Sequence, residues 1–141
     1  MHFNRIPFYH FKYFGFLLLL LIASCSSTNT LCYQSGANDV ADIRLNFYKN
    51  QKFKLYFKEL QETKSKTYTF KGKWNDQKES YQLRFKLSSD GKPDVKALFD
   101  PSITSSRTVR IIDRSTVEFK KSSKTIYVWG LPCSKIDLKK K

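Results

Sequence analysis

Residues 43–58, IRLNFYKNQKFKLYFK, decide the fold class of this chain. Apolar and polar side chains alternate through residues 43–47 and again through residues 53–58, and the polar stretch between them predicts a turn. Successive side chains of a strand point to opposite faces, so a period of two predicts strands that are buried on one face only. We therefore expect an antiparallel hairpin here, and not a helix.

The same alternation continues toward the C-terminus. Further strands are predicted at residues 68–74, 81–87, 95–99, 109–113, 116–119 and 125–129. The longest loop within the domain is expected at residues 100–108. About eight short antiparallel strands in consecutive order predict an all-β meander over residues 39–134, either a small barrel or a two-sheet sandwich. The aromatic residues that either fill its core or line a pocket are Tyr68, Phe70, Trp74, Tyr81, Phe85 and Phe99.

The N-terminus has the three parts of a secretory signal. Arg5 and Lys12 precede an apolar run at residues 14–23. The run is followed by Ser24 and Cys25. A helix needs about 20 apolar residues to span a bilayer, and this run has about half of that. We therefore expect a helical signal peptide that is cleaved, and not a permanent transmembrane anchor.

The residues before the cysteine, Leu-Ile-Ala-Ser-Cys at positions 21–25, resemble the lipobox of bacterial lipoproteins. The resemblance implies that residues 1–24 are removed, that Cys25 carries fatty acyl chains such as palmitate, and that residues 25–38 form a tether. Two or more acyl chains hold a protein firmly on a membrane. Ser26 follows the cysteine where an aspartate would favour inner-membrane retention, so the outer membrane and its periplasmic face are expected. The alternative is ordinary cleavage that leaves Cys25 unmodified.

Two further cysteines, Cys32 and Cys133, lie near the two ends of the predicted domain. An even number of cysteines in an exported chain favours a disulfide. Closing a loop of about 100 residues in this way stabilises a domain by roughly 4–5 kcal/mol in the chain-entropy model. The alternative is two free, buried thiols.

Residues 40–131 resemble in strand pattern the lipocalin-like small barrels of envelope lipoproteins, including the N-terminal barrel of the NlpE family. The meander and the segment 68–74, with its Gly72-Lys73-Trp74 sequence, carry this resemblance. It implies a barrel that is either filled by side chains or open to one small ligand. The chain lacks the Cys-x-x-Cys pair that this family uses in copper handling, so we expect no metal role.

Catalytic chemistry is poorly represented in the mature chain. His2 and His10, the two histidines, both lie in the signal, which excludes Ser-His-Asp and Cys-His arrangements and removes the commonest metal ligands. The aspartates that could act as acid or base fall in predicted turns, where aspartate is common for backbone reasons; they are Asp39, Asp42, Asp90, Asp94 and Asp100. We expect no enzyme activity, no cofactor and no metal.

The chain is strongly basic, with 26 Lys and Arg against 12 Asp and Glu and a formal net charge of +14. Basic residues gather on the polar face of the predicted strands, and the candidates for contact with an anionic surface are Lys54, Lys71, Lys73, Arg84 and Lys86. A C-terminal tail at residues 135–141 adds Lys139, Lys140 and Lys141. If the strands are neighbours, like charges lie opposite each other, which is destabilising without counter-ions. The alternative is a lysine-rich composition without a functional role.

These features predict a lipid-anchored, non-catalytic envelope lipoprotein whose barrel binds a small ligand or an anionic envelope component. Anionic lipid, lipopolysaccharide or an envelope protein are the expected partners. Nucleic acid is not expected, because the compartment excludes it. The alternative is a structural or assembly lipoprotein with a filled barrel that docks a protein partner.

Overall fold

The computed structural model describes residues 29–61, 63–99, 108–136 and 138. The predicted signal peptide at 1–24, the lipidation residue Cys25, residues 100–107 of the predicted loop and the lysines at 139–141 lie outside the described residues.

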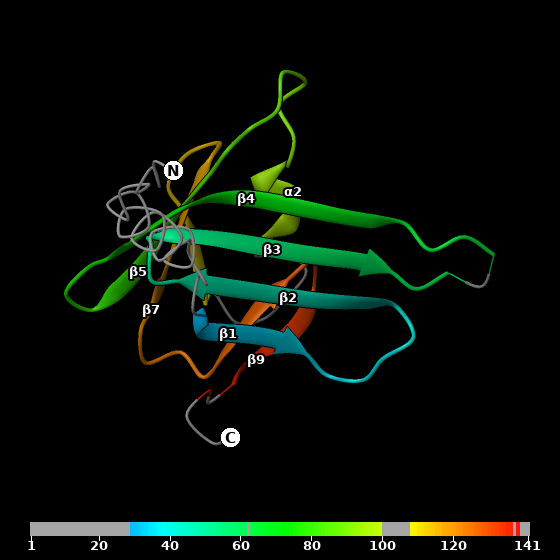
Figure 1. The fold of residues 1–141 in the computed structure, drawn as a ribbon, viewed down its shortest axis with the longest axis horizontal. Coiled ribbons are helices and arrows are strands. Elements are labelled where there is room, and N and C mark those ends of the chain that lie inside the picture. The colour runs from blue at the N-terminus through cyan, green and yellow to red at the C-terminus, as the bar shows by residue number, and fades with distance from the viewer. Residues whose placement is uncertain (1–28, 62, 100–107, 137, 139–141) are drawn as a thin grey trace, which may run out of the picture.

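Within these residues, nine antiparallel strands form one sheet that curls into a nearly closed barrel (Figure 1). Along the sheet the strands follow the order β6-β7-β5-β4-β3-β2-β1-β9-β8. Their bounds are β1 Asn29–Ser35, β2 Ala41–Tyr48, β3 Lys52–Glu59, β4 Thr67–Asp76, β5 Ser80–Phe85, β6 Val109–Ile111, β7 Thr116–Lys120, β8 Thr125–Val128 and β9 Leu131–Ile136. One short helix, α2 Val95–Leu98, lies between β5 and β6. The all-β antiparallel class and the barrel predicted from the sequence are confirmed.

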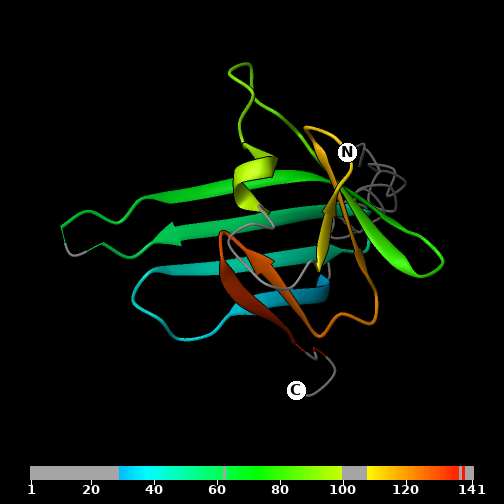
Figure 2. The same ribbon diagram turned by 180° about the vertical axis from the view of Figure 1, so that it is seen from behind.

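Strands β1 to β5 follow one another along the sheet, and the later strands complete the barrel behind them. Seen from behind in Figure 2, the β8–β9 hairpin and α2 cross in front of β1 to β4. The chain therefore does not form a simple meander to its end. Instead, β9 returns to pair with β1, and β7 pairs with β5.

Three local predictions were wrong. Residues 29–35 were expected to belong to a tether, but they form β1, with Leu31, Tyr33 and Ser35 buried. Residues 131–136 form a further strand, β9, which extends past the predicted domain boundary at 134. Residues 95–98, predicted as a strand, form α2.

The reason for the α2 helix is local. The Asp94 carboxylate accepts a hydrogen bond from the Ala97 amide at 3.2 Å and so caps the first turn. Val95 and Leu98, three residues apart, are both buried on one side of that turn.

Aromatic side chains fill the middle of the barrel. The Tyr33 ring meets the Phe119 ring edge-on at 5.5 Å, and the Phe47 ring meets those of Trp74 and Phe119 at 5.5 and 6.2 Å. The Tyr33 hydroxyl donates a hydrogen bond to the Ser123 carbonyl at 2.8 Å, so its polar end is satisfied. This part of the interior is a packed core and not a hollow ligand chamber.

Gly72 lets two aromatic rings meet across β4. It lies opposite Phe53 on β3 and Phe85 on β5, and those two rings pack edge-on at 4.9 Å. A Cβ at this position would lie 2.1 Å from the Arg84 carbonyl oxygen and 2.6 Å from the Phe53 ring. Two residues later the Trp74 indole donates to the Tyr48 carbonyl at 2.9 Å. The Gly72-Lys73-Trp74 sequence thus has a packing role in this fold.

We expect Gly72→Ala to lower the free energy of unfolding by about 3 kcal/mol, at the upper end of what overpacking costs. The measurement is urea unfolding of the chain from Ser26 to Lys141. Gly36→Ala is the control, because a Cβ at Gly36 meets nothing within 4 Å. Equal stability of the two variants would contradict the packing role of Gly72.

Candidate functional site

A ladder of basic side chains crosses the outer face of β3, β4 and β5. The register places Lys73 opposite both Lys52 and Arg84, and places Lys54 opposite Lys71. The Lys86 amide donates to the Lys71 carbonyl at 2.8 Å, which extends the second row. We call these six exposed residues the basic ladder: Lys52, Lys54, Lys71, Lys73, Arg84 and Lys86.

The basic ladder has no acidic partner among the described residues. The three ion pairs found there join Arg44 to Asp42, Arg110 to Glu118, and Lys121 to Asp76. One member of the ladder has a neutral contact, since the Lys54 ammonium lies 5.8 Å from the centroid of the Tyr48 ring. Like charges directly opposite each other on a sheet are destabilising. This face therefore carries an electrostatic cost that an anionic partner would relieve.

The basic ladder begins at the end of the sheet where the described chain enters. Asn29 pairs with Tyr48 at the end of β2, and the turn after Tyr48 leads directly to Lys52. Lys52 and Lys73 then lie opposite each other on the next two strands. Neighbouring strands are about 4.8 Å apart, so Asn29 and the first row of the ladder lie on the same small patch of the barrel.

The predicted aromatic set is divided between core and cavity. Phe85 and Phe99 are buried, and Trp74 and Tyr81 pack against the core. Tyr68 lines a cavity of about 330 Å³, and Phe70 both lines this cavity and packs against the core. Their rings stack nearly parallel, with centroids 6.1 Å apart and an angle of 11° between the planes.

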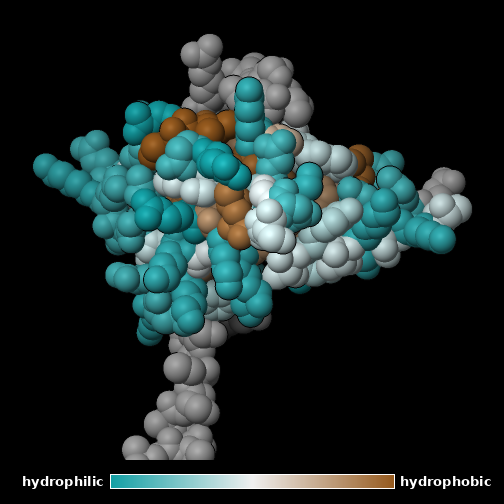
Figure 3. Space-filling view, turned by 90° about the horizontal axis from the view of Figure 1, so that it is seen from above, coloured by the Kyte–Doolittle hydropathy of each residue, from teal (hydrophilic) through white to brown (hydrophobic). Residues whose placement is uncertain are grey.

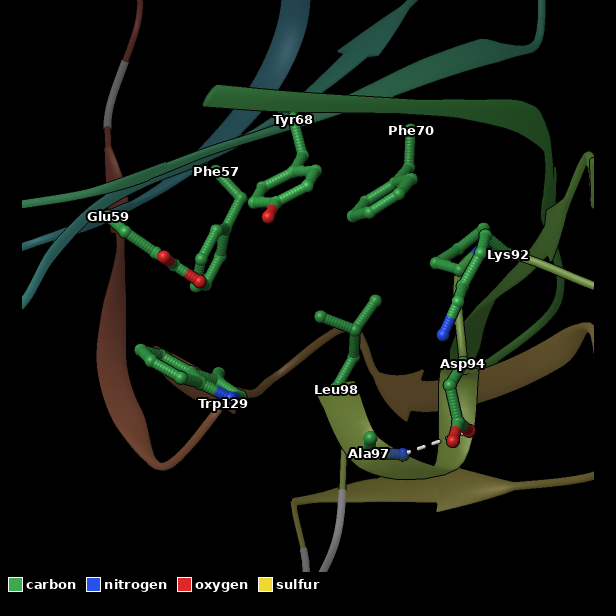
Figure 4. Close-up of a pocket in the computed structure, with 10 residues that line it drawn as sticks. Phe57, Glu59, Tyr68, Phe70, Lys92, Asp94, Ala97, Leu98 and Trp129 are labelled. Atoms are coloured by element: carbon green, nitrogen blue, oxygen red, sulfur yellow. Dashed lines mark hydrogen bonds between the residues drawn. The ribbon is translucent and has the colours of Figure 1, made fainter. Parts of the chain in front are cut away.

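The cavity lies between β3, β4, α2 and the turn that joins β8 to β9 (Figure 4). Figure 4 shows the Tyr68 and Phe70 rings side by side on β4, pointing toward Leu98 of α2. Its apolar lining is formed by Phe57, Tyr68, Phe70, Pro93, Ala97, Leu98 and Trp129. Glu59, Lys92 and Asp94 are its polar members.

Sequence reasoning missed Phe57 and Trp129 as cavity residues. The Phe57 ring packs edge-on against Trp129, with centroids 5.0 Å apart. Trp129 belongs to the two-residue turn between Val128 and Leu131, and both turn residues have positive φ, 52° at Trp129 and 75° at Gly130. The Trp129 amide donates to the Leu98 carbonyl at 2.6 Å, which ties this turn to α2. The available signal was Gly130, which directly follows Trp129 at the end of the predicted strand 125–129.

Hydrophilic residues cover most of the molecule when it is seen from above, and hydrophobic residues gather in small areas between them (Figure 3). Among the exposed large apolar side chains, Trp129 is 40% and Tyr68 39% exposed, and both border the cavity. Exposed apolar groups that gather at one cavity mark a binding site more often than scattered ones do.

The two cysteines do not form the predicted disulfide. Cys32 and Cys133 are both free and buried, which was the alternative. Cys32 pairs with Ile136, whereas Cys133 pairs with Ser35, so the two lie three residues apart along the β1–β9 ladder. An odd offset places their side chains on opposite faces, and three residues span about 10 Å, beyond the Cα separation that a disulfide allows.

Burial raises the pKa of the Cys133 thiol to about 12 and also raises the pKa of Cys32. Both thiols therefore stay protonated and unreactive at neutral pH.

We expect the chain from Ser26, which lacks Cys25, to react slowly with a thiol reagent at pH 8 when it is folded. In denaturant without reductant, two thiols per chain should react at once. Absorbance of the released chromophore measures both. No reaction in denaturant would mean that the cysteines are joined and that the register of β9 is different.

Metal and membrane-span candidates are absent from the part of the chain that the structure describes. No group of three or more His, Cys, Asp or Glu side chains there could hold a metal ion. None of its helices has the length and apolar character needed to cross a membrane. Comparison with family models, with curated proteins and with solved structures finds no match.

Proposed function

We propose that this chain is a non-catalytic envelope lipoprotein, anchored to the outer membrane through Cys25, whose basic ladder binds an anionic envelope component. Anionic phospholipid and lipopolysaccharide have the required chemistry, because both present clustered negative groups at a membrane surface. The alternative is an assembly lipoprotein whose filled barrel docks a protein partner. The two differ in their dependence on surface charge.

One observation carries the proposal, namely the opposition of Lys73 to both Lys52 and Arg84 on adjacent strands. Each like-charge pair costs a few tenths to about 1 kcal/mol of stability. A face that served only as a solvated surface would gain stability from an acid in the middle position. The placement of three cations in one row is explained if an anionic surface neutralises them in the working state.

The position of the ladder supports the same reading. Cys25 lies four residues before Asn29, a reach of at most about 14 Å at roughly 3.5 Å per residue. Acyl chains on Cys25 would therefore bring the Asn29 end of the barrel, with Lys52 and Lys73, close to the lipid headgroups. A cation near an anionic membrane surface contributes about 1 kcal/mol to binding.

We expect Lys73→Glu to weaken binding of the chain from Ser26 to vesicles containing phosphatidylglycerol by about tenfold at low salt, from the loss of a cation and the added repulsion. The same change should raise the free energy of unfolding by about 0.5–1 kcal/mol, because two like-charge pairs become opposite-charge pairs. Vesicle co-sedimentation and urea unfolding measure the two effects.

Lys64→Glu is the matched control, since it makes the same charge change at an exposed position in the β3–β4 turn, at the end of the sheet remote from Asn29. It should change neither quantity appreciably. If both variants lost vesicle binding equally, binding would depend on the net charge of the protein and not on the position of the basic ladder. Binding to neutral phosphatidylcholine vesicles that matches binding to anionic ones would favour the protein-docking alternative.

The C-terminal lysines provide a second test of the same orientation. β9 pairs with β1, and Ile136 lies opposite Cys32, so the tail leaves the barrel near the end where the chain enters. Deleting Lys139 to Lys141 should weaken binding to anionic vesicles, with up to about 1 kcal/mol lost per lysine. Replacing Lys64, Lys66 and Lys96 with serine removes the same charge at the remote end of the barrel and is the control. Unchanged partition of the deletion variant at low salt would reject this role of the tail.

A further inference from the structure

The aromatic cavity opens at the end of the sheet that is remote from Asn29. Its residues Glu59 and Tyr68 lie at the end of β3 and the start of β4, with Glu59 opposite Ala41 and Tyr68 level with Ile43. Asn29 lies opposite Tyr48, at the other end of β2. With the chain anchored as proposed above, the cavity faces away from the membrane. Its occupant would therefore come from the surrounding solution and not from the bilayer.

Trp129, which lines the cavity, has a backbone conformation that is unfavourable for a large side chain. A two-residue hairpin turn with positive φ at both positions favours Asn-Gly or Gly-Gly. A φ of 52° is a left-handed backbone conformation, which is unfavourable for a bulky aromatic residue. The side chain also leaves 40% of its surface exposed, so it lies at the mouth of the cavity and not in the core. Its position against Phe57 at the mouth of the cavity is a reason for its presence.

The charge of the cavity is opposite to that of the chain as a whole. Two carboxylates, Glu59 and Asp94, border it together with one ammonium group, Lys92. Neither carboxylate takes part in the three ion pairs of the described residues. Figure 4 shows Lys92 near Asp94, whereas Glu59 lies on the other side of the cavity beside Phe57 and Trp129. The aromatic corner of the cavity therefore carries an unpaired negative charge.

We propose that this cavity binds a small, freely diffusing molecule with an apolar body and an alkylammonium group. The apolar body occupies the space between the stacked Tyr68 and Phe70 rings and Leu98. The ammonium group lies in the corner formed by Phe57, Trp129 and Glu59. Aromatic faces attract cations through their quadrupole, tryptophan most strongly, and a carboxylate beside them adds a direct ionic contact. A volume of about 330 Å³ is within the range of small-molecule sites.

The test compares octyltrimethylammonium, octanol and octyl sulfate, each below its micelle concentration, by titration calorimetry on the chain from Ser26. This chain keeps every described strand, since β1 begins at Asn29. We expect octyltrimethylammonium to bind about tenfold more tightly than octanol, and octyl sulfate to gain nothing from the cavity. Absence of octyltrimethylammonium binding, or equal affinity for all three, would overturn the proposal.

Two variants locate the binding. Trp129→Asn introduces a residue that the turn favours, so it should preserve or raise stability while it removes most of the octyltrimethylammonium affinity. Any octyl sulfate that still binds this variant binds outside the cavity, for example on the basic ladder. Glu59→Gln keeps the shape of the cavity and should remove the preference for the ammonium over octanol. Unchanged affinities in either variant would overturn the proposal, and neither change touches the basic ladder.

Discussion

The pairing of β1 with β9 is the constraint on which the rest of this structure depends. It joins the two ends of the described chain across most of its length, with Cys32 opposite Ile136 and Ser35 opposite Cys133. Bringing such distant segments together costs loop-closure entropy, which grows slowly with loop length. Burial offsets that cost at this junction, because Tyr33 and Cys133 are both fully buried in the core. Hydrogen-bonded pairing and packing therefore hold the two ends of the domain together, a role that the sequence analysis assigned to a disulfide.

This closure gives the barrel two chemically different regions. At the Asn29 end, the outer face of β3 to β5 presents cations that lie opposite one another without acidic partners in the described residues. At the Ser35 end, α2 and the β8–β9 turn meet the inner face of β3 and β4 around an aromatic cavity with two carboxylates. Between them, the interior is filled by the rings around Phe47. The chain has a formal net charge of +14, but the cavity is bordered by more carboxylates than ammonium groups.

The sequence predicted the parts of the fold that depend on side-chain alternation. Residues 43–47 and 53–58 lie within β2 and β3 because their apolar side chains share one face. The prediction of a strand at residues 95–98 was wrong because the Asp94 cap favours a helical turn there. The alternation in β1 was overlooked because its first residues, Asn29 and Thr30, resemble a linker. The disulfide prediction was wrong because strand register decides which face each cysteine occupies, and register cannot be read from a cysteine count. The Trp129 conformation depends on a turn between two strands, one of which had not been recognised.

Residue-resolved amide hydrogen exchange, on the chain from Ser26 under reducing conditions, tests the role of the β1–β9 pairing most directly. The amides of β1 and β9 should exchange with the same free energy of opening as those of β2 and β3, because no covalent bond is needed to keep the ends together and all four strands open only on global unfolding. Exchange of β9 at a much lower free energy, while β2 and β3 remain protected, would show that the ends are not held by this pairing and would contradict the account.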